Sequence, residues 1–273
     1  MEYLQIRHYQ IPKLGFGTYR LRGREASDLV SLALRNGYRH LDTAQMYRNE
    51  MEVGRAIRQS SLDRDDLWVT TKVWHTELSS ERFLPSVEAS LDRLSLDYVD
   101  LLLIHWPSPE VSVEEAVTNL MMAQDRDLCR AIGVSNFNME LMAEALALSA
   151  ELITNQVEYH PFLDQSTLLD FVTAQEMSLT AYSPLAQGAV LHDPTVRDIA
   201  EKHGKLPAQI ALRWLLDQEP VIAIPMTANP KHLRSNADIF RIRLDAEDKR
   251  RLDQLTQQKR RLVDPEFAPE WDS

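Results

Sequence analysis

The sequence has one cysteine, no long hydrophobic run and only eight glycines. Cys129 cannot form an internal disulfide, and chains without disulfides are typical of reducing compartments. No apolar run approaches the roughly 20 residues that a membrane-spanning helix requires. The first residues also lack the basic and apolar regions of a secretory signal. We therefore expect a cytoplasmic protein that does not enter a membrane.

Positive charge is also scarce, because the sequence has 30 Lys and Arg against 41 Asp and Glu, which gives a net charge of −11. This balance disfavours binding of nucleic acid or anionic lipid through the general surface, although it allows a local basic pocket for a phosphate. The eight histidines show neither HExxH nor paired ligand spacing, and Gly133-Val134-Ser135-Asn136 is not a GxSxG nucleophile elbow. We expect no metal centre and no serine nucleophile.

Short apolar runs alternate with amphipathic segments along the chain. The runs, expected as strands, cover residues 13–18, 40–42, 67–73, 99–105, 131–135, 153–157, 179–182 and 221–225. The amphipathic segments, expected as helices, cover residues 25–36, 49–59, 80–94 (with Ser79 or Ser80 as N-cap), 113–124, 139–149, 166–175, 196–203, 207–216, 230–239 and 246–255. Eight strand–helix units over this length can close into a barrel. We predict an α/β fold, a (β/α)8 TIM barrel in one domain over residues 1–273, with an N-terminal β-hairpin (3–6 and 10–14) and extra C-terminal helices.

A doubly wound open sheet shows the same alternation and is the main alternative. The barrel is favoured because no GxGxxG phosphate fingerprint follows the first strand, and because polar residues end nearly every strand. The segment Gly15-Phe16-Gly17 carries two glycines, which permit unusual backbone angles or the close approach of a ligand.

Three apolar runs end in residues that can do acid–base chemistry. These residues are Asp42, Lys72 and His105. Because they stand at the carboxyl ends of expected barrel strands, the barrel would bring them to one rim. A buried lysine and aspartate on neighbouring strands would pair. Tyr47 follows on the same loop as Asp42, and charged Lys72 beside it would lower the pKa of the phenol from about 10. Each group alone fits a satisfied core position, but the four together would make a proton donor for an oxygen that gains charge.

Carbonyl reduction needs this proton donor and a hydride donor, which no side chain supplies, so a nicotinamide or similar cofactor must bind at the same rim. Ser135, Asn136 and Gln156 carry donors and acceptors suited to a carboxamide, and Tyr182 offers a flat ring face. Trp74 and Trp106 would wall an apolar substrate pocket or belong to the core.

Several motifs in order resemble the aldo-keto reductases, over about residues 14–236. They are Gly15-Phe16-Gly17-Thr18, His40-Leu41-Asp42-Thr43-Ala44 with Tyr47, Thr70-Thr71-Lys72, His105-Trp106-Pro107, Gly133-Val134-Ser135-Asn136-Phe137, Asn155-Gln156-Val157-Glu158-Tyr159-His160-Pro161 and Ala181-Tyr182-Ser183-Pro184-Leu185. Within the family, the chain is most similar to the bacterial reductases of 2,5-diketo-gluconate and methylglyoxal, including the tail Phe267-Ala268-Pro269-Glu270-Trp271.

The resemblance implies an NADPH-dependent enzyme with Tyr47 as general acid, Asp42 and Lys72 tuning it, and His105 orienting the carbonyl. It implies that Tyr182 stacks on the nicotinamide. The implied cofactor-binding residues are Gly17, Thr18, Ser135, Asn136, Gln156, Tyr182, Ser183, Pro184, Leu185, Ala186, Pro225, Met226, Thr227, His232 and Asn236. The implied substrate pocket contains Tyr19, Trp74 and Trp106.

The loop that would hold the adenosine phosphate departs from the family pattern. Met226 and His232 stand where the family usually has a lysine and an arginine, and Ser235 stands at the position of a glutamate. Lys231 and Arg234 could substitute, together with Thr227, because a helix N-terminus favours an anion. We therefore expect NADP(H), with NAD(H) tolerance.

The function expected from these observations is reduction of small aldehydes, dicarbonyls or keto-sugars by a monomeric enzyme. Short loops after Trp74 and Pro107 predict an open pocket and broad substrate range. The alternative of another class is a nucleotide-binding sensor or regulatory barrel without significant turnover.

Overall fold

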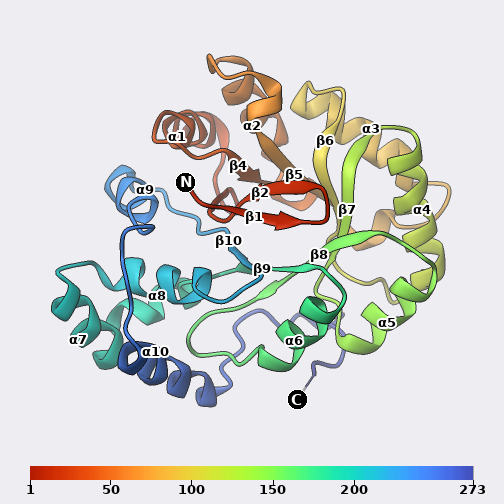
Figure 1. The fold of residues 1–273 in the computed structure, drawn as a ribbon. Helices are drawn as coiled ribbons and strands as arrows, with labels where there is room; N and C mark the ends of the chain where they lie inside the picture. The colour runs from red at the N-terminus through yellow and green to blue at the C-terminus, as the bar shows by residue number, and fades with distance from the viewer. Residues whose placement is uncertain (273) are drawn as a thin grey trace.

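Eight parallel strands occupy the centre of the computed structural model, which describes residues 1–272 (Figure 1). In sheet order they are β3 Gly15–Gly17, β4 His40–Asp42, β5 Trp68–Val73, β6 Val99–Ile104, β7 Cys129–Ser135, β8 Leu152–Glu158, β9 Ser178–Tyr182 and β10 Val221–Ala223. The sheet closes on itself, because Leu14 bridges Ala223 and the Gly17 amide donates to the Pro225 carbonyl at 3.1 Å. The predicted barrel is confirmed, and the open doubly wound sheet is excluded.

The closing seam explains the two glycines of β3. A side chain at Gly17 would lie 2.6 Å from the Ile224 carbonyl oxygen, and one at Gly15 would lie 2.8 Å from the Ile224 side chain. Neither glycine has a positive φ. The unusual backbone angles that we expected there are therefore wrong, and the chain after β10 approaches both glycines closely, while Gly17 also lines the cavity described below.

Helices follow the strands and surround the barrel, as Figure 1 shows. They are α1 Gly23–Arg35, α2 Glu50–Arg58, α3 Phe83–Leu94, α4 Val113–Asp125, α5 Met139–Ala147, α6 Ser166–Ala174, α7 Pro194–His203, α8 Pro207–Leu216, α9 Pro230–Ala237 and α10 Ala246–Asp253. The predicted cap of α3 is wrong, since this helix begins three residues late. Ser80, one of the two expected caps, instead donates hydrogen bonds from its amide and its hydroxyl to Glu115 of α4.

Two hydrophobic cores result from this arrangement. One lies between the strands and the helices, and the smaller one fills the barrel. The hairpin β1 Tyr3–Ile6 and β2 Tyr9–Pro12 contributes Leu4, Ile6 and Ile11 to the smaller core, where they join Leu101 and Leu103 of β6. The predicted hairpin therefore plugs the amino-terminal end of the barrel, which leaves the carboxyl end for a site.

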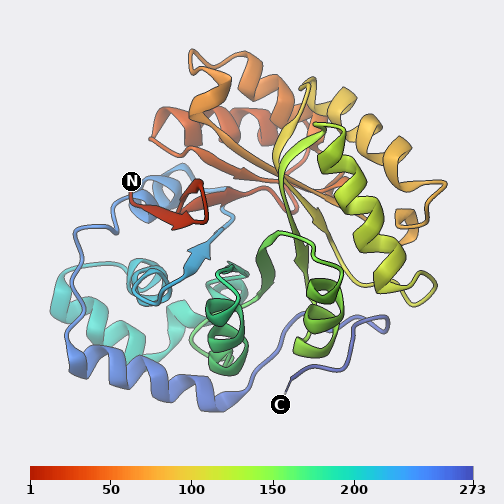
Figure 2. The same cartoon turned by 45° about the vertical axis from the view of Figure 1, so that its right-hand side comes forward.

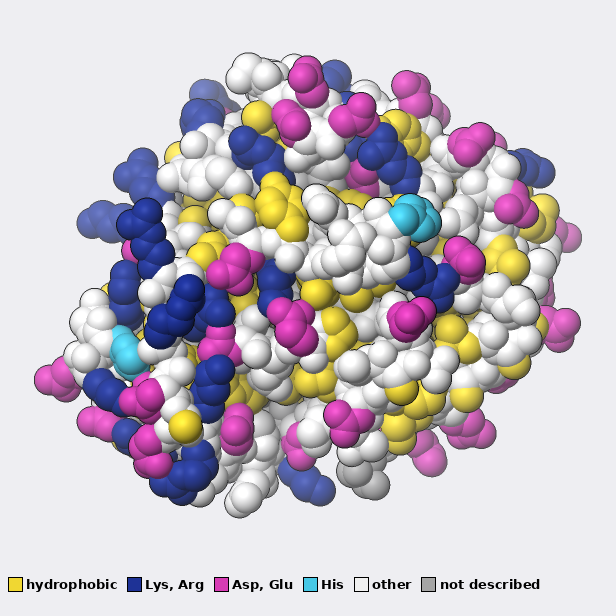
Figure 3. All heavy atoms as spheres, in the orientation of Figure 1, with side chains coloured by type: hydrophobic (Ala, Val, Ile, Leu, Met, Phe, Trp, Pro, Cys, Tyr) yellow, Lys and Arg dark blue, Asp and Glu magenta, His cyan; other side chains and the backbone are white. Residues whose placement is uncertain are grey.

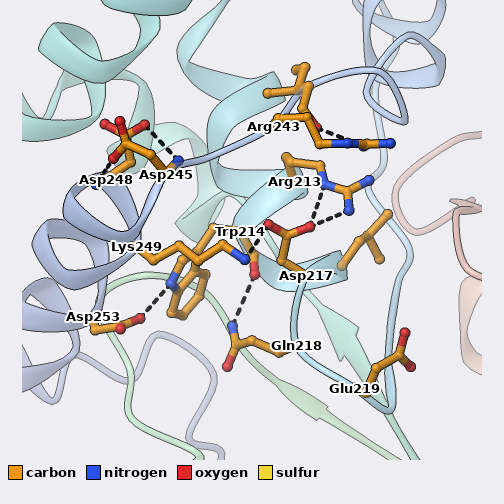
Figure 4. Close-up of polar contacts among 12 residues, drawn as sticks. Arg213, Trp214, Asp217, Gln218, Glu219, Arg243, Asp245, Asp248, Lys249 and Asp253 are labelled. Carbon is orange, nitrogen blue, oxygen red and sulfur yellow. Dashed lines mark hydrogen bonds and ion pairs between the residues drawn. The ribbon is translucent and has the colours of Figure 1, made fainter.

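The C-terminal helix α10 is fixed to α8 by polar contacts (Figure 4). The Asp217 carboxylate forms ion pairs with Arg213 of α8 and with Lys249 of α10, the latter at 2.8 Å. The indole Nε1 of Trp214 donates to Asp253 at 2.8 Å. These contacts hold the start of the C-terminal segment firmly against the barrel wall.

After α10 the chain forms the short turn η5 Gln254–Gln258 and then an aperiodic tail. The tail passes α6 and ends beside α5 (Figures 1 and 2). The Arg260 amide donates to the Phe162 carbonyl at 2.8 Å, and Asn138, before α5, donates to the Glu270 carbonyl at 2.8 Å. The tail therefore wraps one side of the barrel.

Side chains of both charges cover the hairpin face, and Lys and Arg gather toward α1 and α9 (Figure 3). Within residues 1–272, no helix has the length and apolar run needed to span a membrane.

Gly54 of α2 permits the close packing of α2 on α3. A side chain at this position would overlap the backbone carbonyl of Leu94. Although alanine favours helix, we expect Gly54→Ala to lower the free energy of unfolding by about 1–3 kcal/mol, because backbone atoms cannot move aside cheaply. Urea denaturation would measure the change. Arg55→Ala on the exposed side of the same helix is the control, and an equally stable Gly54→Ala would contradict the packing argument.

Candidate active site

A cavity of about 1300 Å³ opens at the carboxyl end of the barrel strands. It extends from the barrel mouth into a groove between the turn η4 Ala186–His192, the start of α8 and the loop after β10. Asp42, Tyr47 and His105 line its inner end, and Lys72 lies fully buried behind them. The structure thus brings the four predicted acid–base residues together.

The Lys72 ammonium is the hub of this group. Its Nζ donates to Asp42 Oδ1 at 2.5 Å, to the Thr43 carbonyl at 2.9 Å and to the Tyr47 hydroxyl at 3.3 Å. Three acceptors around a buried ammonium satisfy its donors, which offsets the cost of removing the charge from water. Burial nevertheless lowers the pKa of Lys72, while Asp42 opposes this shift.

Tyr47 sits on a single turn of 3-10 helix, η1 Gln45–Tyr47, directly after the strand that ends in Asp42. The side chain of Gln45 anchors this turn, because its Oε1 accepts from the Trp74 amide at 2.9 Å and its Nε2 donates to Ser90 at 3.1 Å. The phenol is consequently held against Lys72 by backbone that has little freedom.

The predicted lowering of the Tyr47 pKa is wrong for the protein alone. Burial raises the pKa of Tyr47 well above its usual value, and the Asp42 carboxylate raises it further. The carboxylate lies 2.5 Å from Lys72 Nζ, so its negative charge acts on the phenol together with the positive charge of the ammonium. Tyr47 is therefore protonated at neutral pH, as a proton donor must be.

His105 follows β6 and packs edge-on against two rings, with centroids 5.6 Å from Tyr47 and 5.1 Å from Trp74. Burial lowers the pKa of His105 well below its usual value, and Lys72 and His75 add to this effect. Its Nδ1 is buried and has no hydrogen-bond partner among residues 1–272. The imidazole is therefore neutral, as its predicted role requires.

A chain of hydrogen bonds connects the acid–base group to the predicted carboxamide residues. Gln156 Nε2 donates to Asp42 Oδ2 at 2.8 Å, and the Gln156 carbonyl accepts from the Ser135 hydroxyl at 2.7 Å. Asn136 donates to the Ser135 hydroxyl at 3.0 Å and accepts from the Tyr182 hydroxyl at 2.8 Å. Asn136 adopts a φ of 63°, which turns the chain sharply at the end of β7. The network fixes these polar groups at the cavity wall.

Most of the predicted cofactor residues line the cavity. They are Gly17, Asn136, Gln156, Tyr182, Ser183, Pro184, Leu185, Pro225, Met226, Thr227, His232 and Asn236. Thr18, Ser135 and Ala186 lie fully buried outside the lining. Thr18 bonds the Asp42 carbonyl at 2.9 Å and Ser135 bonds Gln156, so these two support residues that do face the cavity.

The positively charged side chains that face the groove come from a different part of the chain than expected. Lys231 and Arg234 lie outside its lining, so the structure does not support their expected substitution for the missing lysine and arginine. Lys205 and Arg197, from the opposite wall, face the groove instead. The sequence could not identify them, because only the packing of α7 and α8 brings them to the groove.

One polar atom in the groove is suited to an incoming donor. Asn236 lines the groove and is almost fully buried, and its Oδ1 is without a hydrogen-bond partner among residues 1–272. A buried carbonyl oxygen of this kind is costly unless a ligand N–H or water satisfies it. A nucleotide with an exocyclic amine fits this requirement.

Aromatic rings enclose the end of the cavity beside Tyr47 and His105. Tyr19 packs on Tyr47 with centroids 5.1 Å apart, and Trp74 and Trp106, the residues predicted for a substrate pocket, line the wall of the cavity. Phe267 of the tail contacts both tryptophans, at 5.9 Å and 5.6 Å between ring centroids. The tail therefore forms a wall where the short loops predicted an open pocket. In the sequence, only the aromatic residues of the tail pointed to this wall.

Nowhere in residues 1–272 do three His, Cys, Asp or Glu side chains converge as potential metal ligands.

Burial raises the pKa of the Cys129 thiol to about 12, so this cysteine is a poor nucleophile.

Comparison with known proteins gives a consistent result. Residues 13–257 match the model of the aldo/keto reductase family. The chain is 43% identical to methylglyoxal reductase DkgB of Yersinia pestis over 267 residues, which cover 96% of this chain and 99% of that protein. It is 41% identical to glyoxal reductase of Bacillus subtilis strain 168 over 254 residues, 92% of this chain and 91% of that one. A crystal structure assigned provisionally as a 2,5-diketo-D-gluconic acid reductase B superposes with a TM-score of 0.98 at 43% identity, covering 100% and 98% of the two chains.

Proposed function

The chain belongs to the aldo/keto reductase family, and from that premise we propose that it is an NADPH-dependent reductase of small aldehydes, dicarbonyls and keto-sugars. The observation that carries the proposal is the Asp42–Lys72–Tyr47 chain of contacts beside neutral His105, in a cavity that continues into a nucleotide-sized groove. The names of the similar proteins support dicarbonyl and keto-sugar substrates.

Tyr47 acts as the general acid in this proposal. Its hydroxyl gives a proton to the carbonyl oxygen as negative charge develops there, and Lys72 stabilises the phenolate that forms. Asp42 keeps Lys72 charged in the buried site. Because Nδ1 of His105 is enclosed, Nε2 is the nitrogen that can donate to the same carbonyl oxygen and orient it. The nicotinamide cofactor, when bound, supplies the hydride.

The carboxamide of such a cofactor would meet Asn136 and Gln156, and Tyr182 would stack on its ring. Ser183, Pro184 and Leu185 would hold the pyrophosphate. Asn236 would accept from the exocyclic amine of the adenine.

Lys205 and Arg197 would favour NADPH over NADH, because they can offer positive charge to the additional phosphate, although Lys205 also pairs with Asp238 at 3.1 Å and Glu201 lines the same groove. We expect Lys205→Met to raise the KM for NADPH about tenfold and to leave the KM for NADH nearly unchanged. Steady-state kinetics with both cofactors would test this, with Lys231→Met as the control outside the groove. A large preference of the unaltered enzyme for NADH would contradict the assignment.

The decisive experiment is the loss of NADPH absorbance with methylglyoxal and phenylglyoxal. Turnover of either supports the reductase. Binding of NADPH without turnover on a broad panel of carbonyls would instead identify a sensor. We propose a cytoplasmic monomer, which sedimentation and cell fractionation would check.

A further inference from the structure

The tail contacts the barrel through a carboxylate that catalysis does not use. Glu158 is the last residue of β8, and its side chain is fully buried. Its two oxygens accept from the amide of Leu262 at 2.9 and 3.1 Å, and Oε2 accepts from the amide of Val263 at 2.8 Å. Leu262 and Val263 both line the cavity. One buried side chain therefore fixes the backbone of a cavity wall.

The chemistry of this contact favours a single position of the tail. His160 Nε2 bonds Glu158 Oε1 at 2.7 Å, so both oxygens of Glu158 have partners within the barrel or the tail. A buried carboxylate that lost the two tail amides would keep the cost of desolvation with only His160 left to offset it. Displacement of residues 262–263 is consequently unfavourable.

A second anchor holds the far end of the tail. The Asp272 carboxylate accepts from the Met139 amide at the start of α5, at 3.0 and 3.2 Å. Trp271 donates to Asp264 at 2.8 Å and lies under the guanidinium of Arg261, 3.7 Å from its ring centroid. Residues 264–269 therefore form a strap between two fixed ends.

Phe267 lies in the middle of this strap. Its ring contacts His75 at 4.3 Å between centroids, in addition to Trp74 and Trp106. The ring can form the substrate wall only while the strap keeps its place.

We propose that Glu158 is a positioning residue that, by binding the Leu262 and Val263 amides, holds Phe267 as the wall against which the apolar part of a carbonyl substrate packs. The kinetic consequence rests on the proposed reductase function, whereas the anchoring of the tail does not. The substrate class favoured by such a wall is an aryl aldehyde or aryl dicarbonyl rather than a small aliphatic one.

The kinetic test compares Glu158→Gln with the unaltered enzyme on phenylglyoxal and methylglyoxal. We expect the KM for phenylglyoxal to rise about tenfold, the KM for methylglyoxal to rise less than about threefold, and kcat to change less than about threefold. A merely structural role would lower the active fraction and hence kcat for both substrates, without changing either KM. That result, or an unchanged KM for phenylglyoxal, would overturn the proposal.

The matched control is Asp100→Asn. Asp100 is also a nearly fully buried carboxylate that accepts from a backbone amide, that of Val69 at 2.8 Å, but it lies at the opposite end of the barrel. We expect this variant to lose stability and to keep both KM values.

Hydrogen exchange measured by mass spectrometry gives a readout that needs no activity. In Glu158→Gln, the Leu262 and Val263 amides should exchange about tenfold faster or more, and in Asp100→Asn at the original rate. Unchanged exchange would refute the anchor itself. Faster exchange in a protein without reductase activity would refute only the proposed function.

Two further variants keep the test valid if Glu158→Gln does not fold. Val263→Pro removes one of the donors from the tail side and should accelerate exchange of the Leu262 amide. Phe267→Ala should raise the KM for phenylglyoxal by itself. In that background, a second change at Glu158 or Val263 should add nothing to the KM, and an additive effect would overturn the proposed route through Phe267.

Discussion

Replacement of Tyr47 by phenylalanine is expected to lower kcat for carbonyl reduction by about 10³-fold, within the range measured for removal of a general acid. The ring itself would stay in place, because it packs on Tyr19 and His105 at centroid distances of 5.1 and 5.6 Å. Only the hydroxyl, 3.3 Å from Lys72 Nζ, would be lost. The KM for NADPH and the free energy of unfolding should change little.

The control for this experiment is Tyr19→Phe. Tyr19 also lines the cavity, yet it is 42% exposed and its hydroxyl makes no hydrogen bond within residues 1–272. Tyr19→Phe should retain kcat within about threefold, because the Tyr19 hydroxyl, unlike that of Tyr47, has no buried ammonium within hydrogen-bond distance. Equal activity of Tyr47→Phe and the unaltered enzyme would show that another group donates the proton.

Replacement of Lys72 by methionine is expected to affect both stability and catalysis. It would leave the Asp42 carboxylate, which is 1% exposed, without its counter-ion. Breaking a buried ion pair from one side costs about 3–5 kcal/mol of unfolding free energy. The phenolate of Tyr47 would also lose its stabilising neighbour, so kcat should fall at least about 10²-fold.

A second substitution separates the two effects. Asp42→Asn in the Lys72→Met background removes the uncompensated charge and should restore about half of the lost stability or more, since the penalty comes from the unpaired ion. Activity should stay low, because no ammonium faces Tyr47 in either variant. Urea denaturation and steady-state kinetics would be measured on all four combinations. Recovery of activity in the double variant would contradict the role of Lys72.

The barrel and its acid–base group could be predicted from the sequence because both rest on local patterns. Asp42, Lys72 and His105 each follow an apolar run, and parallel strands bring the ends of such runs to one rim. Register then decides the contacts, since Asp42 pairs with Thr70 and the lysine two residues later points to the same side.

Long-range packing could not be predicted in the same way. The tail has no periodicity, and its contact with Glu158 joins residues 104 positions apart. The direction of the Tyr47 pKa shift depends on burial, to which the Asp42 carboxylate adds and which no motif reports. Lys205 faces the groove, whereas Lys231 does not, because of how helices pack on the barrel.

The burial of Tyr47 also bears on how the rates of reduction and of oxidation would depend on pH. In the proposed mechanism, reduction of a carbonyl would start from the protonated phenol, which is the form that the buried site favours at neutral pH. Oxidation of the product alcohol would have to start from the phenolate, which is rare until the solution is strongly alkaline. If Tyr47 is the general acid, we therefore expect carbonyl reduction to need no alkali and alcohol oxidation to become faster as the pH rises.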